Sequence, residues 1–228
     1  MSQTQLKALV IGATGAVGHE LINQLSQQNY EITAVVRRRA TFHQPVTQLI
    51  CPNFSDLSGF IEREAGDLSG TQVFSALGTT LKQAGSKDAF KAVDYGYNLA
   101  FAKAALKQGA RHYLLVSAHG ASADSWSFYS KTKGKLEEAI AKLNFDSCVF
   151  FRPSLLLADH SGRMLESIGV GLIRPINRFF DEPPAPSVWP ITPEKVARAM
   201  VGLSQRCAKQ PTGVLRVSNK TMHKGVTP

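Results

Sequence analysis

Short apolar runs of five or six residues alternate along the chain with longer segments whose apolar residues recur at helical spacing. The apolar runs carry few polar interruptions, as is typical of parallel strands buried on both faces. They lie at residues 7–12, 31–36, 46–50, 72–76, 112–117 and 147–152. Helical patterns fall at 16–28, 90–108 and 128–143. The alternation predicts an α/β fold with a doubly wound parallel sheet.

The C-terminal part has a different texture, because prolines interrupt the stretch between 175 and 193. A helix is predicted over 193–205 and a last strand over 213–217. The composition marks no flexible linker, and a segment of this length rarely builds a large core alone. We therefore expect a single domain over 1–228, in which 153–228 forms a small cap on the substrate side. The polar tail, 219–228, is expected to be loosely held.

Composition narrows the class of protein. Hydrophobic residues make up 43% of the chain and charged residues 19%, which is too apolar for a disordered protein. No apolar run is long enough to cross a membrane, and the first residues lack a secretory signal pattern. The three cysteines, Cys51, Cys148 and Cys207, are odd in number and have no CxxC spacing. This argues against a fully paired disulfide framework and a cysteine-built zinc site, so we expect a reduced, cytoplasmic protein.

The basic balance, with 26 Lys and Arg against 17 Asp and Glu and hence a net charge of +9, raises the question of nucleic acid. The positive residues are spread along the chain, and their only tight cluster is 37–39. No basic stretch interleaved with aromatic residues accompanies it. We therefore expect no nucleic-acid partner, and an anionic small ligand accounts better for the cluster. The sequence leaves the oligomeric state open.

A glycine pattern joins the first predicted strand to the first helix. Gly12 would permit a tight turn, Gly15 would let the backbone approach a pyrophosphate, and Gly18 would allow close packing of helix on strand. The helix N-terminus then offers unpaired N–H groups to phosphate. The alternative is a purely structural turn. The position of the glycine pattern, between a strand and a helix, predicts a Rossmann-type dinucleotide site. The candidate phosphate-binding residues are Gly12, Thr14, Gly15, Ala16, Val17 and Gly18.

The choice of dinucleotide depends on the end of the second strand. A site selective for NAD usually carries an acidic residue there, which accepts from the ribose 2′-hydroxyl. This chain has Arg37 and Arg38 instead. A guanidinium can pair with a 2′-phosphate, whereas a carboxylate would repel it. The alternative is a solvated basic loop. The pattern favours NADP(H) as the cofactor.

A candidate catalytic group follows the fifth strand. Tyr129 and Lys133 are four residues apart in a helical segment and so share one face. A nearby ammonium favours negative charge on a phenolic oxygen, which suits a tyrosine to acid–base work. Ser117 ends the fifth strand, where ligands gather in such sheets, and could donate to a substrate carbonyl. The histidines show no metal-ligand spacing, so no metal site is expected.

Together these segments resemble the short-chain dehydrogenase/reductase superfamily, and within it the atypical, Tat-interactive-protein-like oxidoreductases. The resemblance covers about residues 6–203. It is carried by residues 12–18, 36–38, 76–80, 93–94, 115–117, 129–133 and 151–153.

The resemblance implies an NADP(H)-binding Rossmann domain in which Ser117, Tyr129 and Lys133 form the catalytic triad. Tyr129 would be the acid–base group, Ser117 would orient the carbonyl, and Lys133 would also hold the nicotinamide ribose. Gly78 and Thr79 would line the cofactor. Residues 152–153 would begin the substrate cleft.

The sequence departs from the family pattern at one position. Many relatives carry an aspartate after the third strand, where it contacts the adenine. Asn53 stands there in this chain, and it could still bind the base.

The sequence thus leads to an NADP(H)-dependent oxidoreductase that transfers hydride between nicotinamide and a small carbonyl or alcohol substrate. Its main alternative is an NADPH-binding regulatory or redox-sensing protein that acts through a protein partner with little turnover. A sugar-nucleotide epimerase is a third interpretation, weakened by the short C-terminal region.

Overall fold

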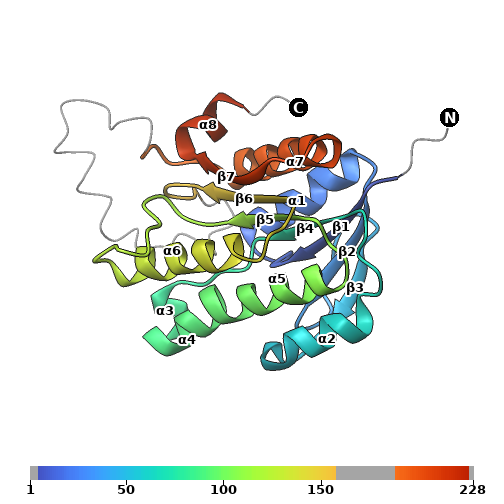
Figure 1. Cartoon of the computed structure of the whole chain (residues 1–228), viewed down its shortest axis with the longest axis horizontal. Coiled ribbons are helices and arrows are strands. Elements are labelled where there is room, and N and C mark those ends of the chain that lie inside the picture. Colours follow the sequence, from blue (N-terminus) through green and yellow to red (C-terminus); the bar gives the residue numbers. More distant parts are fainter. Residues whose placement is uncertain (1–4, 158–187, 226–228) are drawn as a thin grey trace.

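The computed structural model describes residues 5–157 and 188–225. At its centre lies a seven-stranded sheet in which all neighbouring strands are parallel, in the order β3-β2-β1-β4-β5-β6-β7 (Figure 1). The strands are β1 (Lys7–Ile11), β2 (Glu31–Val36), β3 (Thr47–Ile50), β4 (Thr71–Ser75), β5 (His112–Val116), β6 (Ser147–Arg152) and β7 (Gly213–Ser218). This is the doubly wound α/β fold that the sequence predicts.

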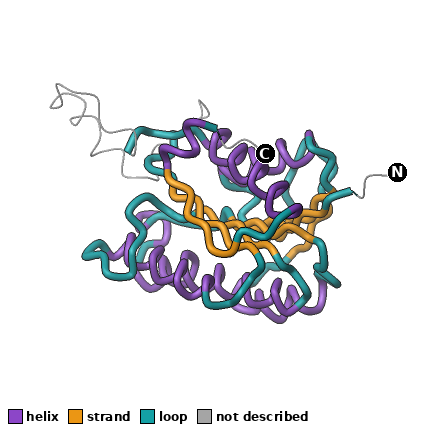
Figure 2. Tube along the Cα trace, turned by 45° about the horizontal axis from the view of Figure 1, so that its top comes forward, coloured by secondary structure: helices purple, strands orange, loops and turns teal. Residues whose placement is uncertain are grey.

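Helices cover both faces of the sheet, so that the strands form a middle layer (Figure 2). The helices on one face are α1 (Ala16–Gln27), α7 (Pro193–Lys209) and α8 (Asn219–Lys224). Those on the other face are α2 (Leu57–Glu64), α5 (Asn98–Lys107) and α6 (Phe128–Ala141). Shorter elements complete the second group: η1 (Phe54–Asp56), α3 (Leu81–Ala84), α4 (Lys87–Lys91) and a π-helical turn, η2 (Ala92–Tyr97).

Two apolar cores result, one on each face of the sheet. Side chains alternate along each strand, so Ala8 and Val10 of β1 face the core under α1 and α7, whereas Leu9 and Ile11 face the core under α2 and α5. Continuous apolar strands are therefore required, because both of their faces are buried.

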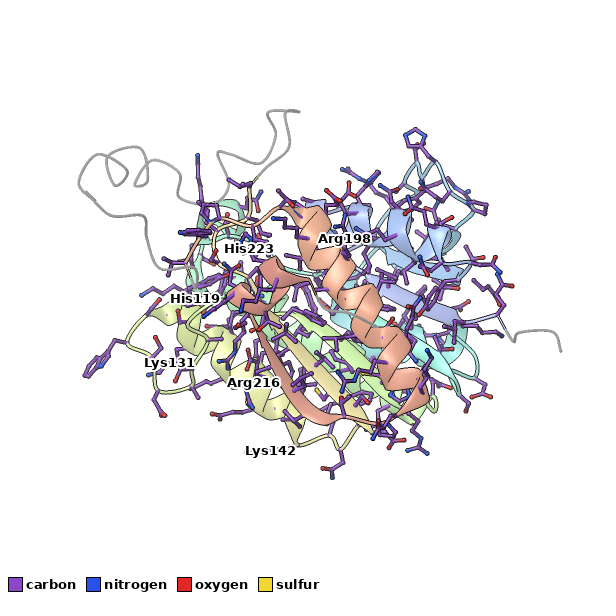
Figure 3. The ribbon with its side chains drawn as sticks, turned by 90° about the horizontal axis from the view of Figure 1, so that it is seen from above. His119, Lys131, Lys142, Arg198, Arg216 and His223 are labelled. Atoms are coloured by element: carbon purple, nitrogen blue, oxygen red, sulfur yellow. The ribbon has the colours of Figure 1, made fainter. Side chains whose placement is uncertain are left out.

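Helices α1 and α7 pack against each other on one face of the sheet. The hydroxyl groups of Tyr30 and Ser204 are hydrogen bonded at 3.0 Å in the buried layer between β2 and α7. Nearer the surface, the Gln24 side chain donates to the Glu194 carbonyl at 3.0 Å. Seen from above, α7 lies over this face with Arg198 on its exposed side (Figure 3). The C-terminal region thus adds the edge strand β7 to the sheet that contains β1, and it packs α7 against α1 on one face of that sheet.

Strand order reverses between β1 and β4. Chain order runs outward from β1 through β2 to β3 on one side, and from β4 onward to β7 on the other. At such a switch point the connections after the two central strands leave toward opposite faces, which opens a crevice at the carboxyl ends. The loops after β1, β4 and β5 meet there, and with them the candidate site residues.

The predicted strands agree with the observed ones within one residue at each end, and the helices predicted at 16–28, 128–143 and 193–205 are confirmed as α1, α6 and α7. The predicted helix over 90–108 is interrupted. It begins as α4, widens into the π-helical turn η2, and continues as α5. Proline-rich residues 158–187 lie outside the described residues.

The expectation of a loosely held tail is wrong for residues 219–224, which form α8. Asn219 is 1% exposed, and Met222 packs into the core beneath α7 and β7. The Asn219 side chain accepts from the Ser154 N–H at 3.0 Å and donates to the Trp189 carbonyl at 2.8 Å. The Asn219 amide and the apolar Met222 side chain therefore hold a segment whose composition is mostly polar.

The three cysteines are buried and unpaired. Burial raises the pKa of the Cys148 thiol to about 12, as expected for a small apolar side chain in the core. Among the described residues, no helix is both long enough and apolar enough to traverse a bilayer.

Candidate active site

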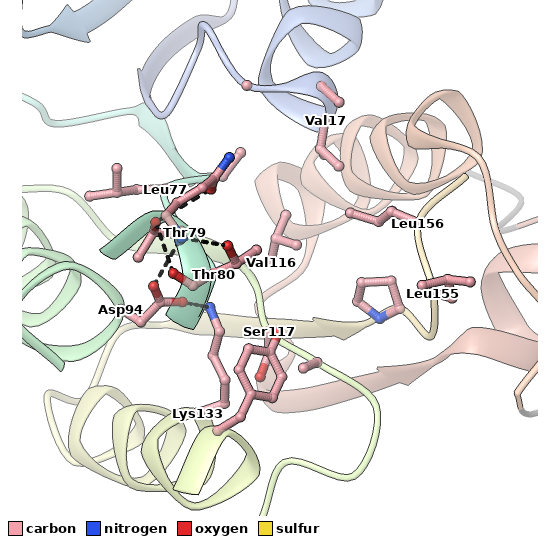
Figure 4. Close-up of a pocket in the computed structure, with 18 of the residues that line it drawn as sticks. Val17, Leu77, Thr79, Thr80, Asp94, Val116, Ser117, Lys133, Leu155 and Leu156 are labelled. Carbon is pink, nitrogen blue, oxygen red and sulfur yellow. Dashed lines mark hydrogen bonds and ion pairs between the residues drawn. The ribbon is translucent and has the colours of Figure 1, made fainter. Parts of the chain in front are cut away.

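A cavity of about 640 Å³ opens at the carboxyl edge of the sheet, at the switch point between β1 and β4 (Figure 4). Its volume lies in the range usual for small-molecule sites. The loops that follow β1, β4, β5 and β6 supply most of its wall, together with α6. The lining residues include Gly15, Ala16, Val17, Ala76, Leu77, Gly78, Thr79, Asp94, Val116, Ser117, Tyr129, Lys133, Pro153, Leu155 and Leu156.

The three glycines of the first turn have different tasks. Gly12 has φ +80°, and a Cβ there would lie 2.4 Å from the Ala76 carbonyl carbon, so the turn packs directly on the loop after β4. A Cβ on Gly18 would lie 2.0 Å from the Gly12 oxygen. These two glycines are therefore needed by the fold itself. A Cβ on Gly15 would meet only the Gly12 oxygen, at 3.4 Å, and Gly15 lines the cavity.

The N-terminus of α1 is open toward the cavity. Gly15 is its N-cap and supplies no side-chain cap, and the first turn holds no acidic residue. The first backbone N–H groups of a helix lack partners within the helix, and they carry the positive end of its dipole. With Ala16 and Val17 in the lining, this end can bind the phosphates of a dinucleotide.

Tyr129 and Lys133 both reach the cavity from one face of α6. The helix begins after Ser127, whose side chain accepts from the Ser130 N–H, so the tyrosine stands in the first turn. The Tyr129 ring packs beside Phe90 with ring centres 5.6 Å apart, and 37% of the residue remains exposed. The phenol is thus held on one side and accessible on the other.

Lys133 is buried, and its ammonium forms an ion pair with Asp94 at 2.6 Å (Figure 4). Burial, the largest influence, lowers the pKa of Lys133, but the Asp94 carboxylate together with Tyr129 and Glu137 more than offsets it. The pKa of Lys133 is therefore raised above its ordinary value. The lysine stays charged inside the wall of the cavity.

Two side chains from one helical segment hold the loop after β4. Asp94 accepts from the Thr79 N–H at 2.8 Å, and the Asn98 side chain donates to the Leu77 carbonyl at 3.2 Å. The Ser75 hydroxyl donates to the Asn98 amide oxygen at 2.5 Å. The cavity wall from Leu77 to Thr79 is therefore fixed by buried hydrogen bonds.

The Ser117 hydroxyl lies in the lining, but it donates to Glu137 at 2.5 Å. A serine hydroxyl has a single proton, so in this arrangement it presents lone pairs to the cavity. Its predicted role as donor to a carbonyl stays a prediction, and requires the hydroxyl to turn.

Glu137 is the centre of a second charged cluster behind α6. It is 1% exposed, and it accepts from Arg152 at 2.9 and 2.6 Å and from Arg216 at 3.2 Å. One carboxylate thus joins α6 to β5, β6 and β7. The Arg152 fork gives this pairing the planar geometry of a strong ion pair.

The sequence analysis gave Asp94 and Glu137 no role. Glu137 follows Lys133 by one helical turn, and Asp94 stands in the otherwise apolar stretch that leads into α5. An acidic residue inside an apolar helical pattern is the signal that could have marked Asp94.

Other predicted cofactor residues lie outside the cavity lining. Thr14, Arg37 and Arg38 are exposed, the two arginines directly after β2. Neither arginine forms an ion pair with a described residue. The Asn53 side chain accepts from the Ser55 N–H and caps η1, in the loop after the edge strand β3. Their contacts with a cofactor stay predictions.

Comparison with known proteins bears on the same residues. The model of the NAD(P)H-binding family matches residues 12–162, which includes the glycine turn, the loop after β4 and α6. The chain belongs to this family. A nicotinamide dinucleotide is accordingly the cofactor class of this NAD(P)H-binding protein.

Two fungal relatives share much of its sequence. "Protein FMP52, mitochondrial" of Candida albicans is 39% identical over 169 residues, which is 73% of this chain and 72% of the relative. The Debaryomyces hansenii protein of the same name is 34% identical over 218 residues, covering 91% and 92%. The expectation of a cytoplasmic protein is wrong in the light of these names. Reduced cysteines and the lack of a secretory pattern argue only against the secretory route, and they do not separate the cytoplasm from the mitochondrion.

Among solved structures, a short-chain dehydrogenase/reductase family oxidoreductase from Burkholderia thailandensis superposes with a TM-score of 0.67 at 18% identity, over 98% of this chain and 95% of that one. The NAD(P)H-binding protein therefore has the short-chain dehydrogenase/reductase fold, as the resemblance in its sequence implied.

Proposed function

We propose that the protein is an NADP(H)-dependent oxidoreductase of the short-chain dehydrogenase type, acting on a small carbonyl or alcohol. The observation that carries this proposal is the shared placement of Tyr129 and Lys133 on one face of α6, opposite the open N-terminus of α1. A phosphate-binding helix end and a proton-transfer residue then face one cavity. The bound cofactor would supply or accept the hydride.

In this proposal Tyr129 donates its phenolic proton to the carbonyl oxygen during reduction, and takes it back during oxidation. The Lys133 ammonium stabilises negative charge on the phenolic oxygen and binds the cofactor ribose. Ser117, once its hydroxyl turns from Glu137 toward the cavity, donates to the reacting oxygen beside Tyr129. The ring contact with Phe90 keeps the tyrosine turned toward the cavity.

The preference for NADP(H) over NAD(H) belongs to the same proposal. Arg37 and Arg38 stand exposed at the carboxyl end of β2, beside β1 and the glycine turn that follows it. They are free to pair with a 2′-phosphate, and the end of β2 offers no carboxylate that would bind a 2′-hydroxyl.

Apart from Ser154, whose hydroxyl donates to the Trp189 carbonyl, the described part of the wall beyond Ser117 is apolar, and this favours a substrate with an uncharged carbon skeleton. Val116 and Ala118 flank the serine. Across the cavity the chain leaves β6 through Pro153, Leu155 and Leu156 (Figure 4). None of these side chains could pair with a phosphate or carboxylate of the substrate.

The test is single-turnover oxidation of NADPH by a panel of aldehydes and ketones, with Tyr129→Phe beside the parent. The variant removes one oxygen and keeps the ring, so NADPH affinity should be unchanged. Turnover should fall by about 10²- to 10⁴-fold, the usual contribution of a general acid or base. Tyr95→Phe is the matched control, because Tyr95 lies in a separate groove between α5 and α6 and its loss should leave turnover intact.

Turnover that survives in Tyr129→Phe would remove the tyrosine from the mechanism. If the parent binds NADPH but oxidises it with no member of the panel, the regulatory alternative, in which NADPH controls binding of a protein partner, replaces the enzyme.

A further inference from the structure

The wall of the cavity contains an ion pair between two buried side chains. The side chain of Lys133 is 5% exposed and that of Asp94 is 1% exposed. An unpaired charge in such a place is strongly disfavoured, so the buried Lys133 ammonium needs the Asp94 carboxylate beside it. The pair lies beside the cavity, where Lys133 forms part of the lining.

The two oxygens of Asp94 serve different parts of the wall. Oδ1 lies 2.6 Å from the Lys133 ammonium, and Oδ2 accepts from the Thr79 N–H at 2.8 Å. Asp94 itself stands in the π-helical turn η2, between α4 and α5. Such turns occur often at functional sites. The Asp94 carboxylate therefore joins α6 to the loop after β4.

Gly78 leaves this ion pair open toward the cavity. A Cβ on Gly78 would lie 3.4 Å from Asp94 Oδ1 and 3.7 Å from Lys133 Nζ. A side chain at this position would stand directly against the pair. With glycine there, the ammonium remains open to the cavity. An ammonium has three N–H donors, so it can donate to a ligand in the cavity as well as to Asp94.

We propose that Asp94 is a positioning residue, whose carboxylate keeps the Lys133 ammonium charged and directed at the cavity, so that cofactor binding does not weaken at alkaline pH. The inference rests on the proposed function, in which Lys133 binds the cofactor. In this role Asp94 acts through Lys133.

Few other charges face Lys133. On its own helix these are Tyr129 and Glu137, and Asp94 faces it from η2. Directly after β5, the Ser117 hydroxyl also lines the cavity, but its proton is donated to Glu137. Glu137 is itself neutralised by Arg152 and Arg216. Asp94 is thus the carboxylate on which the charge of Lys133 depends, and without it burial would lower the pKa of the lysine.

The decisive variant is Asp94→Asn, which keeps the shape and can still accept from the Thr79 N–H, but has no charge. NADPH affinity would be measured by fluorescence titration from pH 7 to 10, where the 2′-phosphate stays ionised. We expect constant affinity in the parent. In Asp94→Asn affinity should fall progressively with pH, by about ten- to hundredfold at the alkaline end, the factor expected for one charge-assisted hydrogen bond.

Two controls separate the possible failures. Lys133→Met should bind NADPH weakly at every pH, without a slope, and Asp88→Asn, an exposed acid on α4, should match the parent. Parent affinity in Lys133→Met would show that the lysine does not bind the cofactor, and would remove that part of the proposed function. Weak binding by Lys133→Met, together with a flat profile in Asp94→Asn, would overturn only the role of Asp94.

A second measurement needs no change at Asp94. In the parent protein, the lysine side-chain NMR signal that disappears in Lys133→Met should not titrate below pH 10. Titration of this signal below pH 10 would overturn the inference even if Asp94→Asn does not fold.

Discussion

Replacing Gly15 and Gly18 by alanine should separate cofactor binding from folding within a single turn. Gly15 has φ −80° and ψ 170°, which any residue can adopt, and the added Cβ would meet only the Gly12 oxygen at 3.4 Å. Alanine is a poorer N-cap than glycine by about 1 kcal/mol, but it loses less backbone entropy, by about 0.4–1 kcal/mol. The stability of Gly15→Ala should therefore change by less than about 1 kcal/mol.

The same methyl group would have a large effect on the ligand. A phosphate oxygen bonded to backbone N–H groups approaches to about 2.9 Å, and a methyl group at Gly15 needs more than 3.4 Å from its neighbours. Loss of one or two charge-assisted hydrogen bonds, at about 1.5–3 kcal/mol each, lowers affinity by at least tenfold. Gly15→Val, with a larger side chain, should abolish binding.

Gly18→Ala is the opposite case. Its Cβ would lie 2.0 Å from the Gly12 oxygen, so α1 must move away from β1. Overpacking of this kind costs about 1–3 kcal/mol or more, and Tm should fall by roughly 2–12 °C for a chain of this size.

Thermal unfolding of both variants, followed by NADPH titration at a temperature where both are folded, completes the assay. Parent-like NADPH affinity in Gly15→Ala would refute the assignment of this turn to the pyrophosphate. A fall in Tm equal to that of Gly18→Ala would show that Gly15 is structural as well.

Two further predictions concern charged groups. Replacing Arg37 and Arg38 together by alanine should weaken NADPH by about ten- to hundredfold and leave NADH nearly unchanged, and equal losses in calorimetry would refute the 2′-phosphate contact. Glu137→Gln should lower the free energy of unfolding by about 1–3 kcal/mol, because it removes the buried carboxylate that accepts from Ser117 and pairs with the partly exposed Arg152 and Arg216, whereas the exposed neighbour Glu138→Gln should change it by less than about 0.5 kcal/mol. Denaturant unfolding of the two variants measures this difference, and equal values would exclude a structural role for the Glu137 cluster.

Local patterns were sufficient to predict the sheet. The central strands are largely apolar on both faces because helices cover both sides, and a mainly apolar run such as 31–36 is visible without any knowledge of its neighbours. The glycine turn was predictable for a similar reason, since its three glycines lie within seven residues between a strand and a helix.

Elements with little apolar content were missed. In α2 only Leu57 and Ile61 are buried, and a glycine stands between them. The helix α8 depends on the Ser218 cap and on contacts that Asn219 makes with distant parts of the chain. The π-helical turn at Asp94 shifts the helical phase, so a periodic pattern could not place it.

The charged partners in the site could not be predicted, because they are distant in sequence. Glu137 and Arg216 are 79 residues apart, and they meet only because β7 pairs with β6 at the edge of the sheet. The role of Ser117 toward a substrate carbonyl stays a prediction. The hydrogen bond from Ser117 to Glu137 depends on the packing of α6 against β5, which no local pattern expresses.

The contact between α1 and α7 affects the order in which the chain can fold. Its hydrogen bonds join residues 170 to 177 positions apart, among them Gln24 with Glu194 and Gln28 with Gln205. During synthesis, the apolar face of α1 and the open edge of β6 stay uncovered until α7 and β7 have left the ribosome. Contacts of such long range slow folding, and they leave apolar surface and an unpaired strand edge exposed until they form. A nascent chain of this protein is therefore expected to need chaperone protection until β7 has emerged.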